Sequence, residues 1–237
     1  MIKYDQGISD TSQYLKPTEL CDWDNPDILR KAKELTGKSE SQQETALSIF
    51  YYVRDDIAFS INDSKTKASQ TLRAGFGDCG SKTNLHVAIL RASGIPARYH
   101  ISKCRSDPLK GIIPEWLFNR MPKVASHFWP EVYLSEKWIA CEGMLDRDLY
   151  SGLLGRNQLD KNQIPTIDWD GVNDSIILKP WLVEDCGTTP FYEDIYRMID
   201  VTRKEEGMPP RIVERLFGWI IYSFFKRHTD KIRKTVI

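Results

Sequence analysis

Apolar residues recur at helical spacing in three separate parts of the chain. The strongest pattern covers residues 39–59, and a shorter one covers residues 25–35, where Pro26 suits the first turn of a helix. A third pattern covers residues 209–234. The candidate N-caps are Asn25 and Ser39 or Ser41, and the apolar positions are Ile28, Leu29 and Leu35, then Ala46, Leu47, Phe50 and Val53, then Ile212, Val213, Leu216, Trp219, Ile220 and Phe224.

The segment GFGDCGSKTNLHVAILRASGIPARYHISKC, residues 75–104, joins a glycine-rich turn to a helical pattern and then to a strand. Gly75 and Gly77 allow the chain to turn sharply. The apolar face that begins after Cys79 ends near Gly94. We therefore expect Cys79 to lie at the N-terminus of a helix.

Residues 127–142, HFWPEVYLSEKWIACE, alternate between apolar and polar positions around a short turn and predict a β-hairpin. The 22 residues 105–126 before it are too many for an ordinary connection and too apolar for a disordered one. Pro114 can start a short helix within them. Trp116 belongs to an apolar group there that either forms one wall of a cleft beside His127 or simply covers the core.

Together these elements predict an α+β fold. We expect residues 143–190 to form a mixed section that is rich in loops. The chain contains no internal repeat. We expect a single domain over residues 1–237, with a core at about 40–150 and an extension at about 150–237 that ends in the C-terminal helix.

Composition narrows the classes of function. Lys and Arg together count 33, as do Asp and Glu, so no global field favours nucleic acid. No run of residues approaches the roughly 18 apolar residues of a membrane span, and the first residues lack the apolar core of a signal peptide. Five scattered cysteines without a C-x-x-C pair fit a reducing compartment, so we expect a cytoplasmic protein. The basic end of the C-terminal helix could touch an anionic membrane, but packing on the core is the preferred interpretation.

Cys79 stands where a helix can prepare a nucleophile. Unpaired backbone N–H groups and the helix dipole favour an anion at a helix N-terminus, so we expect the pKa of the Cys79 thiol to fall below that of a free cysteine. The N–H of Cys79 itself could also stabilise an oxyanion. The alternative is that Cys79, like most free cysteines, is a small buried apolar residue.

A reactive cysteine needs a nearby base, so a suitable histidine would favour the first interpretation, and the chain has four histidines. His86 follows Cys79 by seven residues, about 10 Å along the helix axis, which is too far for a partner. His100 and His228 are more consistent with structural or exposed positions. His127 begins the first strand of the expected hairpin and is the preferred partner of Cys79.

At this point two motifs resemble those of the transglutaminase-like superfamily. ASQTLRAGFGDCGSKTNLHVAILRASGIPARYH is similar to the cysteine motif of that family, and HFWPEVYLSEKW is similar to its histidine motif. The resemblance covers about residues 68–146. It implies that Cys79 is the nucleophile and that His127 is its proton shuttle.

The third member of the family's catalytic triad is usually an Asp, and WIACEGM offers Glu142 at that place. If Leu134 pairs with Lys137 across a two-residue turn, Glu142 shares a face with His127 at a diagonal distance of about 7 to 8 Å between backbones. Asp146 has the same parity but follows the expected strand end. We therefore favour Glu142, with Asp146 as the alternative.

The resemblance implies a papain-like fold in which a helix carrying the cysteine packs on an antiparallel sheet carrying the histidine. It also implies acyl transfer from amide bonds of a peptide or protein through a thioester, without a cofactor or metal. Hydrolysis, by a cysteine protease or deamidase, is the default outcome. The alternatives are amide cross-linking and a catalytically silent binding domain of the same fold.

A zinc module is the competing interpretation from another class. Cys79, His100, Cys104 and His127 are suitable ligand types, but HISKC contains the only closely spaced pair among them. A second Asp-Cys-Gly, at Cys186, lacks the helix and strand that follow the first, so we expect a loop or core thiol there.

Overall fold

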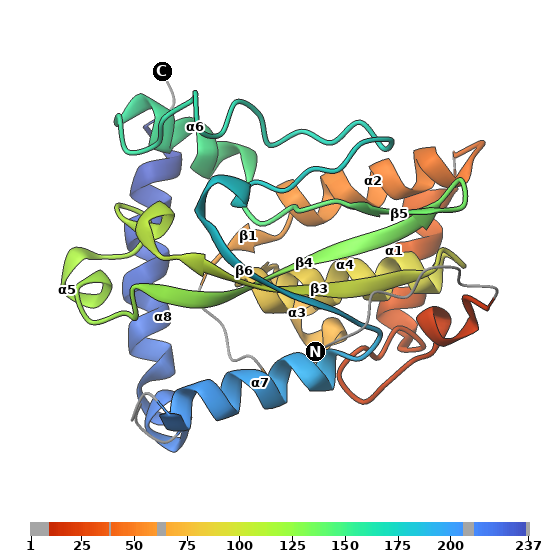
Figure 1. The fold of residues 1–237 in the computed structure, drawn as a ribbon, viewed down its shortest axis with the longest axis horizontal. Helices are drawn as coiled ribbons and strands as arrows, with labels where there is room; N and C mark the ends of the chain where they lie inside the picture. The colour runs from red at the N-terminus through yellow and green to blue at the C-terminus, as the bar shows by residue number, and fades with distance from the viewer. Residues whose placement is uncertain (1–9, 38, 61–64, 206–210, 236–237) are drawn as a thin grey trace.

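The chain folds as a mixed α+β structure built on a curled antiparallel sheet, which confirms the predicted fold class (Figure 1). This computed structural model describes residues 10–37, 39–60, 65–205 and 211–235, with no side chains given for residues 202–221. The strands are β1 (Ala58–Phe59), β2 (Phe76–Gly77), β3 (Ala97–Arg105), β4 (Val124–Leu134), β5 (Lys137–Ala140) and β6 (Leu182–Thr189). The α-helices are α1 (Pro26–Thr36), α2 (Gln42–Asp55), α3 (Ala68–Ala74), α4 (Cys79–Ala92), α5 (Glu115–Phe118), α6 (Arg147–Gly155), α7 (Tyr192–Glu205) and α8 (Arg211–Arg233), and short 3-10 helices cover Ser12–Leu15, Asp107–Leu109 and Lys179–Trp181.

The strand order β5-β4-β3-β6 makes one antiparallel sheet, and β1 and β2 form a separate parallel pair. Helix α4 runs behind β3 and β4 in Figure 1, with α1 and α2 beside it. Residues 80–91 of α4 are all buried, so this helix is the centre of the core.

Local side chains start the helices where the sequence predicts. Asn25 and Ser41 cap α1 and α2. Asp78 caps α4: its carboxylate accepts from the N–H of Ser81 at 2.8 Å, and the Ser81 hydroxyl accepts from the N–H of Asp78 at 2.9 Å. This reciprocal cap begins the helix at Cys79 and confirms the expected position of the cysteine.

The hairpin has the predicted register. Leu134 pairs with Lys137, and the two turn residues, Ser135 and Glu136, have φ values of 49° and 62°. Positive φ at both positions is the conformation of a type I′ turn, whose twist matches that of antiparallel strands. Glu142 therefore follows the end of β5 on the face that the register assigns to it.

The second half of the chain contains more regular structure than the loop-rich interpretation expected. It forms α6, β6 and α7 before the C-terminal helix α8, which stands across one end of the sheet in Figure 1. Residues 107–123, including the predicted short helix α5, pack with α6 and α8 in a second core cluster, whereas Trp116 is 49% exposed.

The apolar spacing of α8 predicts that Phe224 faces the core, but other residues of the helix pack there. Phe224 is 58% exposed, whereas Phe225 and Ile232 are buried. The side chains of the other expected positions, Ile212, Val213, Leu216, Trp219 and Ile220, lie outside the described residues.

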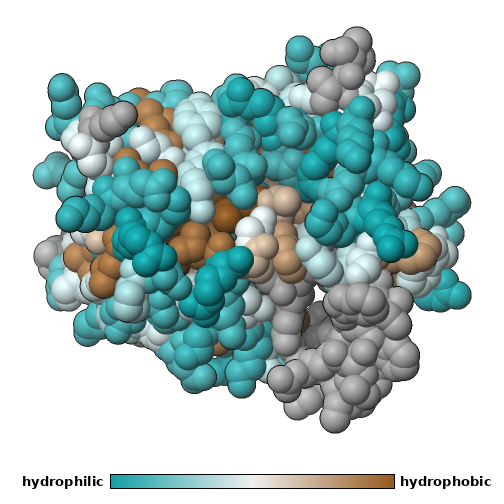
Figure 2. All heavy atoms as spheres, turned by 180° about the vertical axis from the view of Figure 1, so that it is seen from behind, coloured by the Kyte–Doolittle hydropathy of each residue, from teal (hydrophilic) through white to brown (hydrophobic). Residues whose placement is uncertain are grey.

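From behind, the surface is mostly hydrophilic around an apolar area near its centre (Figure 2). Among the described residues, no helix combines the length and the apolar character needed to cross a bilayer.

Candidate active site

Cys79 is the first residue of α4 and keeps part of its surface exposed. The backbone N–H groups of Gly80 and Phe128 hydrogen-bond to its sulfur and lower its pKa. Burial has the larger effect, and together with the negative charges of Asp78 and Glu142 it raises the pKa of the Cys79 thiol well above that of a free cysteine. The helix N-terminus alone therefore does not produce the low pKa that the sequence predicts, and a proton acceptor is needed.

His127 and Glu142 form a buried hydrogen-bonded pair. Nε2 of His127 lies 2.8 Å from Oε1 of Glu142, and their side chains are 5% and 1% exposed. The other carboxylate oxygen of Glu142 accepts from the backbone N–H groups of Ile177 at 2.6 Å and Leu178 at 3.3 Å. A carboxylate held in this way fixes the imidazole ring and favours the tautomer with a proton on Nε2.

The two halves of the site meet where α4 packs on β4. The N–H of Phe128, the residue after His127, reaches the Cys79 sulfur, and the Thr83 hydroxyl donates to the Phe128 carbonyl at 3.3 Å. Because Glu142 engages Nε2 of His127, Nδ1 is the ring nitrogen that remains for another partner. This arrangement suits transfer of the thiol proton to the imidazole, which creates a thiolate without changing the net charge of the pair.

Asp146, the alternative third member, is engaged elsewhere. It caps α6 by accepting from the N–H of Leu149 at 2.9 Å, and it pairs with Arg233 of α8 at 2.7 Å. It also accepts from the N–H of Phe59 at 3.0 Å. The structure thus brings Glu142, and not Asp146, to the imidazole of His127.

The remaining histidines occupy other environments. His100 lies between Glu131 at 2.7 Å and Asp185 at 2.9 Å, and its ring stacks on Trp129 at 4.3 Å. His86 is buried within α4, and His228 contacts the Gly111 carbonyl at 2.9 Å. Where the chain is described, no three His, Cys, Asp or Glu side chains are grouped to hold a metal ion, and all five cysteines are free thiols.

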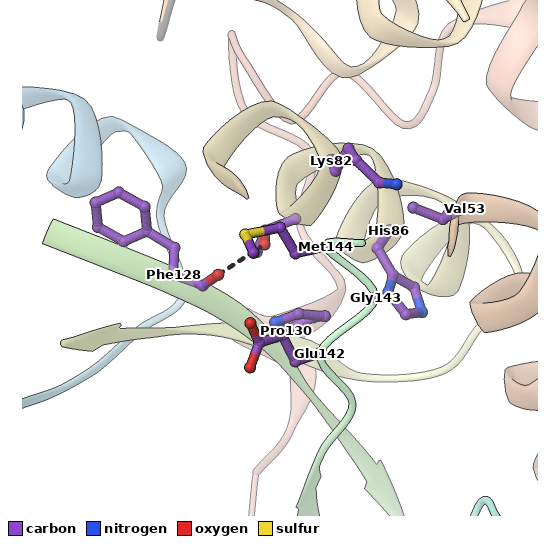
Figure 3. Close-up of a pocket in the computed structure, with 9 residues that line it drawn as sticks. Val53, Lys82, His86, Phe128, Pro130, Glu142, Gly143 and Met144 are labelled. Atoms are coloured by element: carbon purple, nitrogen blue, oxygen red, sulfur yellow. Dashed lines mark hydrogen bonds between the residues drawn. The ribbon is translucent and has the colours of Figure 1, made fainter. Parts of the chain in front are cut away.

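A small cavity is lined by Glu142 and the two residues that follow it and by side chains of α4 (Figure 3). Lys82 and His86, one turn apart on α4, line it together with Met144. The pKa of Lys82 is lowered to about 7, chiefly by burial. Burial also lowers the pKa of His86, to about 3, so His86 is neutral near pH 7, whereas Lys82 loses its proton in that range.

Sequence reasoning missed two parts of this site. The N–H donors of Ile177 and Leu178 come from a segment without a recognisable motif, 35 and 36 residues beyond Glu142. Lysine side chains are almost never fully buried, so nothing in the residue type points to Lys82, yet it is buried. The only local signal for its burial is its position on the apolar side of α4, three residues after Cys79.

Residues 30–143 match the model of the transglutaminase-like superfamily, and this region contains Cys79, His127 and Glu142. This region belongs to the transglutaminase-like superfamily. The family assignment agrees with the motifs and with the helix-on-sheet arrangement of the cysteine and the histidine.

A solved structure shares the fold of this chain. A candidate cysteine protease from Cytophaga hutchinsonii is similar at a TM-score of 0.50 and 20% identity. The match covers 79% of this chain and 49% of that one, so this chain spans about half the length of that relative. A candidate protease from Parabacteroides distasonis gives a TM-score of 0.37 at 15% identity, covering 55% of this chain and 24% of that one. The search of curated proteins gave no significant match.

Proposed function

We propose that the protein is a thiol-dependent acyl-transfer enzyme that acts on amide bonds of a peptide or protein. Cys79 is the nucleophile, His127 the proton shuttle and Glu142 the carboxylate that orients the imidazole. The observation that carries the proposal is the buried His127–Glu142 pair, whose strand packs on the helix that begins at Cys79. A buried imidazole with one nitrogen fixed by a carboxylate is the arrangement that activates a neighbouring thiol.

The reaction begins with proton transfer from the Cys79 sulfur to Nδ1 of His127. The thiolate attacks the amide carbonyl carbon, and the resulting oxyanion is close to the N–H groups at the start of α4, including that of Cys79. The imidazolium then protonates the departing amine, the C–N bond breaks and a thioester remains on Cys79. Glu142 stabilises the positive imidazole throughout.

In the second half of the reaction, His127 takes a proton from water, and the hydroxide attacks the thioester carbon. The C–S bond breaks, the carboxylic acid leaves, and the proton returns to the Cys79 sulfur. Hydrolysis of this kind makes the protein a cysteine protease or a deamidase. An amine that attacks in place of water would give an amide cross-link, which product analysis distinguishes.

We also propose that residues 1–237 act as one domain in a reducing, cytoplasmic environment. Two observations support this view. Cys79 packs against both core clusters, so the extension that contains α6 and α8 shares the core of the active site. All five cysteines are free thiols.

An activity-based thiol probe tests the proposal. Alkylation with an iodoacetamide probe, followed by mapping of the labelled peptide, should modify Cys79 before Cys186, which is also partly exposed and serves as the internal control. Cys79→Ala should remove both the labelling and the turnover of an amide substrate, with an unchanged circular dichroism spectrum. Equal labelling of the two thiols, or turnover that survives Cys79→Ala, would favour a silent binding domain. Stoichiometric zinc in the purified protein would favour the metal module.

A further inference from the structure

The short strand pair β1–β2 leads directly into the active site. Strand β2 ends at Gly77, and only Asp78 separates it from Cys79. Beyond the ladder itself, backbone bonds run from the N–H of Ala58 to the Gly75 carbonyl and from the N–H of Ser60 to the Gly77 carbonyl, both 2.9 Å. An isolated two-stranded pair is marginally stable, so the position of the Cys79 sulfur depends on whatever fixes β1.

The ion pair between Asp146 and Arg233 fixes one end of β1. The Arg233 guanidinium binds both oxygens of Asp146, at 3.0 and 2.7 Å, and also donates to the Phe59 carbonyl at 2.9 Å. Asp146 completes the ring by accepting from the N–H of Phe59 at 3.0 Å. Both polar groups of the Phe59 backbone are thus held by one charged pair, whose side chains are 14% and 5% exposed.

Helix α4 holds the other end of the same segment. Lys82 donates from Nζ to the carbonyls of Ile57 at 2.6 Å and Arg54 at 3.0 Å. A side chain at Gly77 would come within 3.2 Å of that of Lys82, so β2 lies close against the first turn of α4. Strand β1 is therefore fixed between α8 on one side and the helix that carries the nucleophile on the other.

Aromatic side chains of α8 reinforce this connection. Tyr222 stacks on Phe76 of β2 with ring centroids 4.2 Å apart and an interplanar angle of 20°. Phe225 packs edge-on against Phe59 of β1 at 6.1 Å. The C-terminal helix thus contacts both strands that precede Cys79.

We propose that Asp146 and Arg233 are positioning residues, which act through β1 and β2 to set the place of the Cys79 sulfur relative to His127. This inference rests on the proposed function of Cys79 and assigns a role in reactivity to the C-terminal helix. Loss of the Arg233 side chain leaves a buried carboxylate without its counter-ion, so β1 must shift to admit water. A displacement of about 1 Å in an active site can cost about a hundredfold in rate.

The test compares Arg233 with Arg156, a second arginine whose hydrogen bonds connect the end of α8 with the rest of the domain. Arg156 donates to the Thr235 hydroxyl at 2.9 and 2.6 Å and to the Lys231 carbonyl at 2.5 Å, but no hydrogen bond connects it with β1. We expect Arg233→Ala to lower the rate of Cys79 alkylation by on the order of tenfold to a hundredfold across the pH profile, measured well below the unfolding midpoint. Arg156→Ala should lower the unfolding midpoint but leave the alkylation profile as in the unmodified protein.

A conservative variant and a rescue experiment complete the test. Arg233→Lys should give an intermediate alkylation rate, because an ammonium group cannot bind two carboxylate oxygens and the Phe59 carbonyl together. Guanidinium ion added at low concentration should restore part of the rate of Arg233→Ala. If Arg233→Ala does not fold, Arg233→Lys carries the comparison with Arg156→Ala.

The positioning role is wrong if the Arg233 variants lose stability yet keep the alkylation profile of the unmodified protein, or if Arg156→Ala slows alkylation equally. Neither result bears on whether Cys79 is the nucleophile. The proposed function fails instead when Cys79 of the unmodified protein reacts no faster than Cys186, so the two failures are distinguishable.

Discussion

Replacement of Glu142 by Gln separates the effect of the carboxylate charge from the effect of the side-chain volume. The variant keeps the volume of a side chain that is 1% exposed. The amide of glutamine cannot, however, accept hydrogen bonds on both sides as the Glu142 carboxylate does. If its oxygen faces the N–H groups of Ile177 and Leu178, its NH2 group faces Nε2 of His127 and forces the proton onto Nδ1. With a proton already on Nδ1, the imidazole cannot accept the thiol proton at that nitrogen.

The expected loss follows from the charged hydrogen bond at 2.8 Å. Hydrogen bonds to charged groups contribute about 1.5 to 3 kcal/mol, so removal of the carboxylate charge should reduce the population of the thiolate–imidazolium pair about 10- to 100-fold. The Glu142 charge also raises the pKa of Cys79, so the thiol of the variant should ionise more readily at high pH. Glu142→Gln should therefore react more slowly near neutral pH, and the difference should become smaller as the pH approaches the raised pKa of the thiol.

The assay is the rate of iodoacetamide alkylation of Cys79 as a function of pH, with thermal unfolding recorded in parallel. In the unmodified protein, alkylation should continue well below the free-thiol pKa of about 8.5. Asp146→Asn is the matched control: through its bond to Arg233 it should lower the rate at all pH values and should not change the shape of the profile. A Glu142→Gln profile identical to that of the unmodified protein would refute the role of Glu142.

Two further predictions concern stability. The pKa of Lys82 is lowered to about 7 from 10.5, chiefly by burial, so between these pH values the unfolded chain binds a proton that the folded chain does not. The free energy of unfolding should therefore gain up to about 1.4 kcal/mol per pH unit in this window, and Lys82→Met should remove that contribution to the slope. Equal slopes in denaturant titrations of the two proteins would show that Lys82 stays charged. At Gly152 of α6, an added Cβ would overlap the backbone of Ile232 in α8. Gly152→Ala should therefore lower the free energy of unfolding by about 1 to 3 kcal/mol in denaturant titrations. Ser151→Ala, the neighbouring control, should change this free energy little.

Features that depend on near neighbours along the chain follow from the amino-acid sequence alone. The cap at Asp78 closes within three residues, so the start of α4 and the position of Cys79 follow from the local sequence. The turn at Ser135 and Glu136 connects adjacent strands, and its length determines which residues pair. The same register places Glu142 on the face of His127.

Elements with weak local patterns were not predicted. Strand β6 is an edge strand with mostly exposed or partly exposed residues, so it lacks the alternation that identifies a half-buried strand. On α8, spacing selects Phe224, but the neighbouring Phe225 is the buried residue, because contacts with β1 determine which side of the helix faces the core.

The partners of the two carboxylates come from distant parts of the chain. Glu142 receives its N–H donors from residues 35 and 36 positions away, and Asp146 meets Arg233 from 87 positions away. The pKa of Cys79 depends on the same kind of information: the helix N-terminus favours the thiolate, but burial and two nearby carboxylates oppose it more strongly. A sequence specifies hydrogen bonds that close over a few residues. Desolvation and the pairing of distant charges arise only when the chain has brought those groups together.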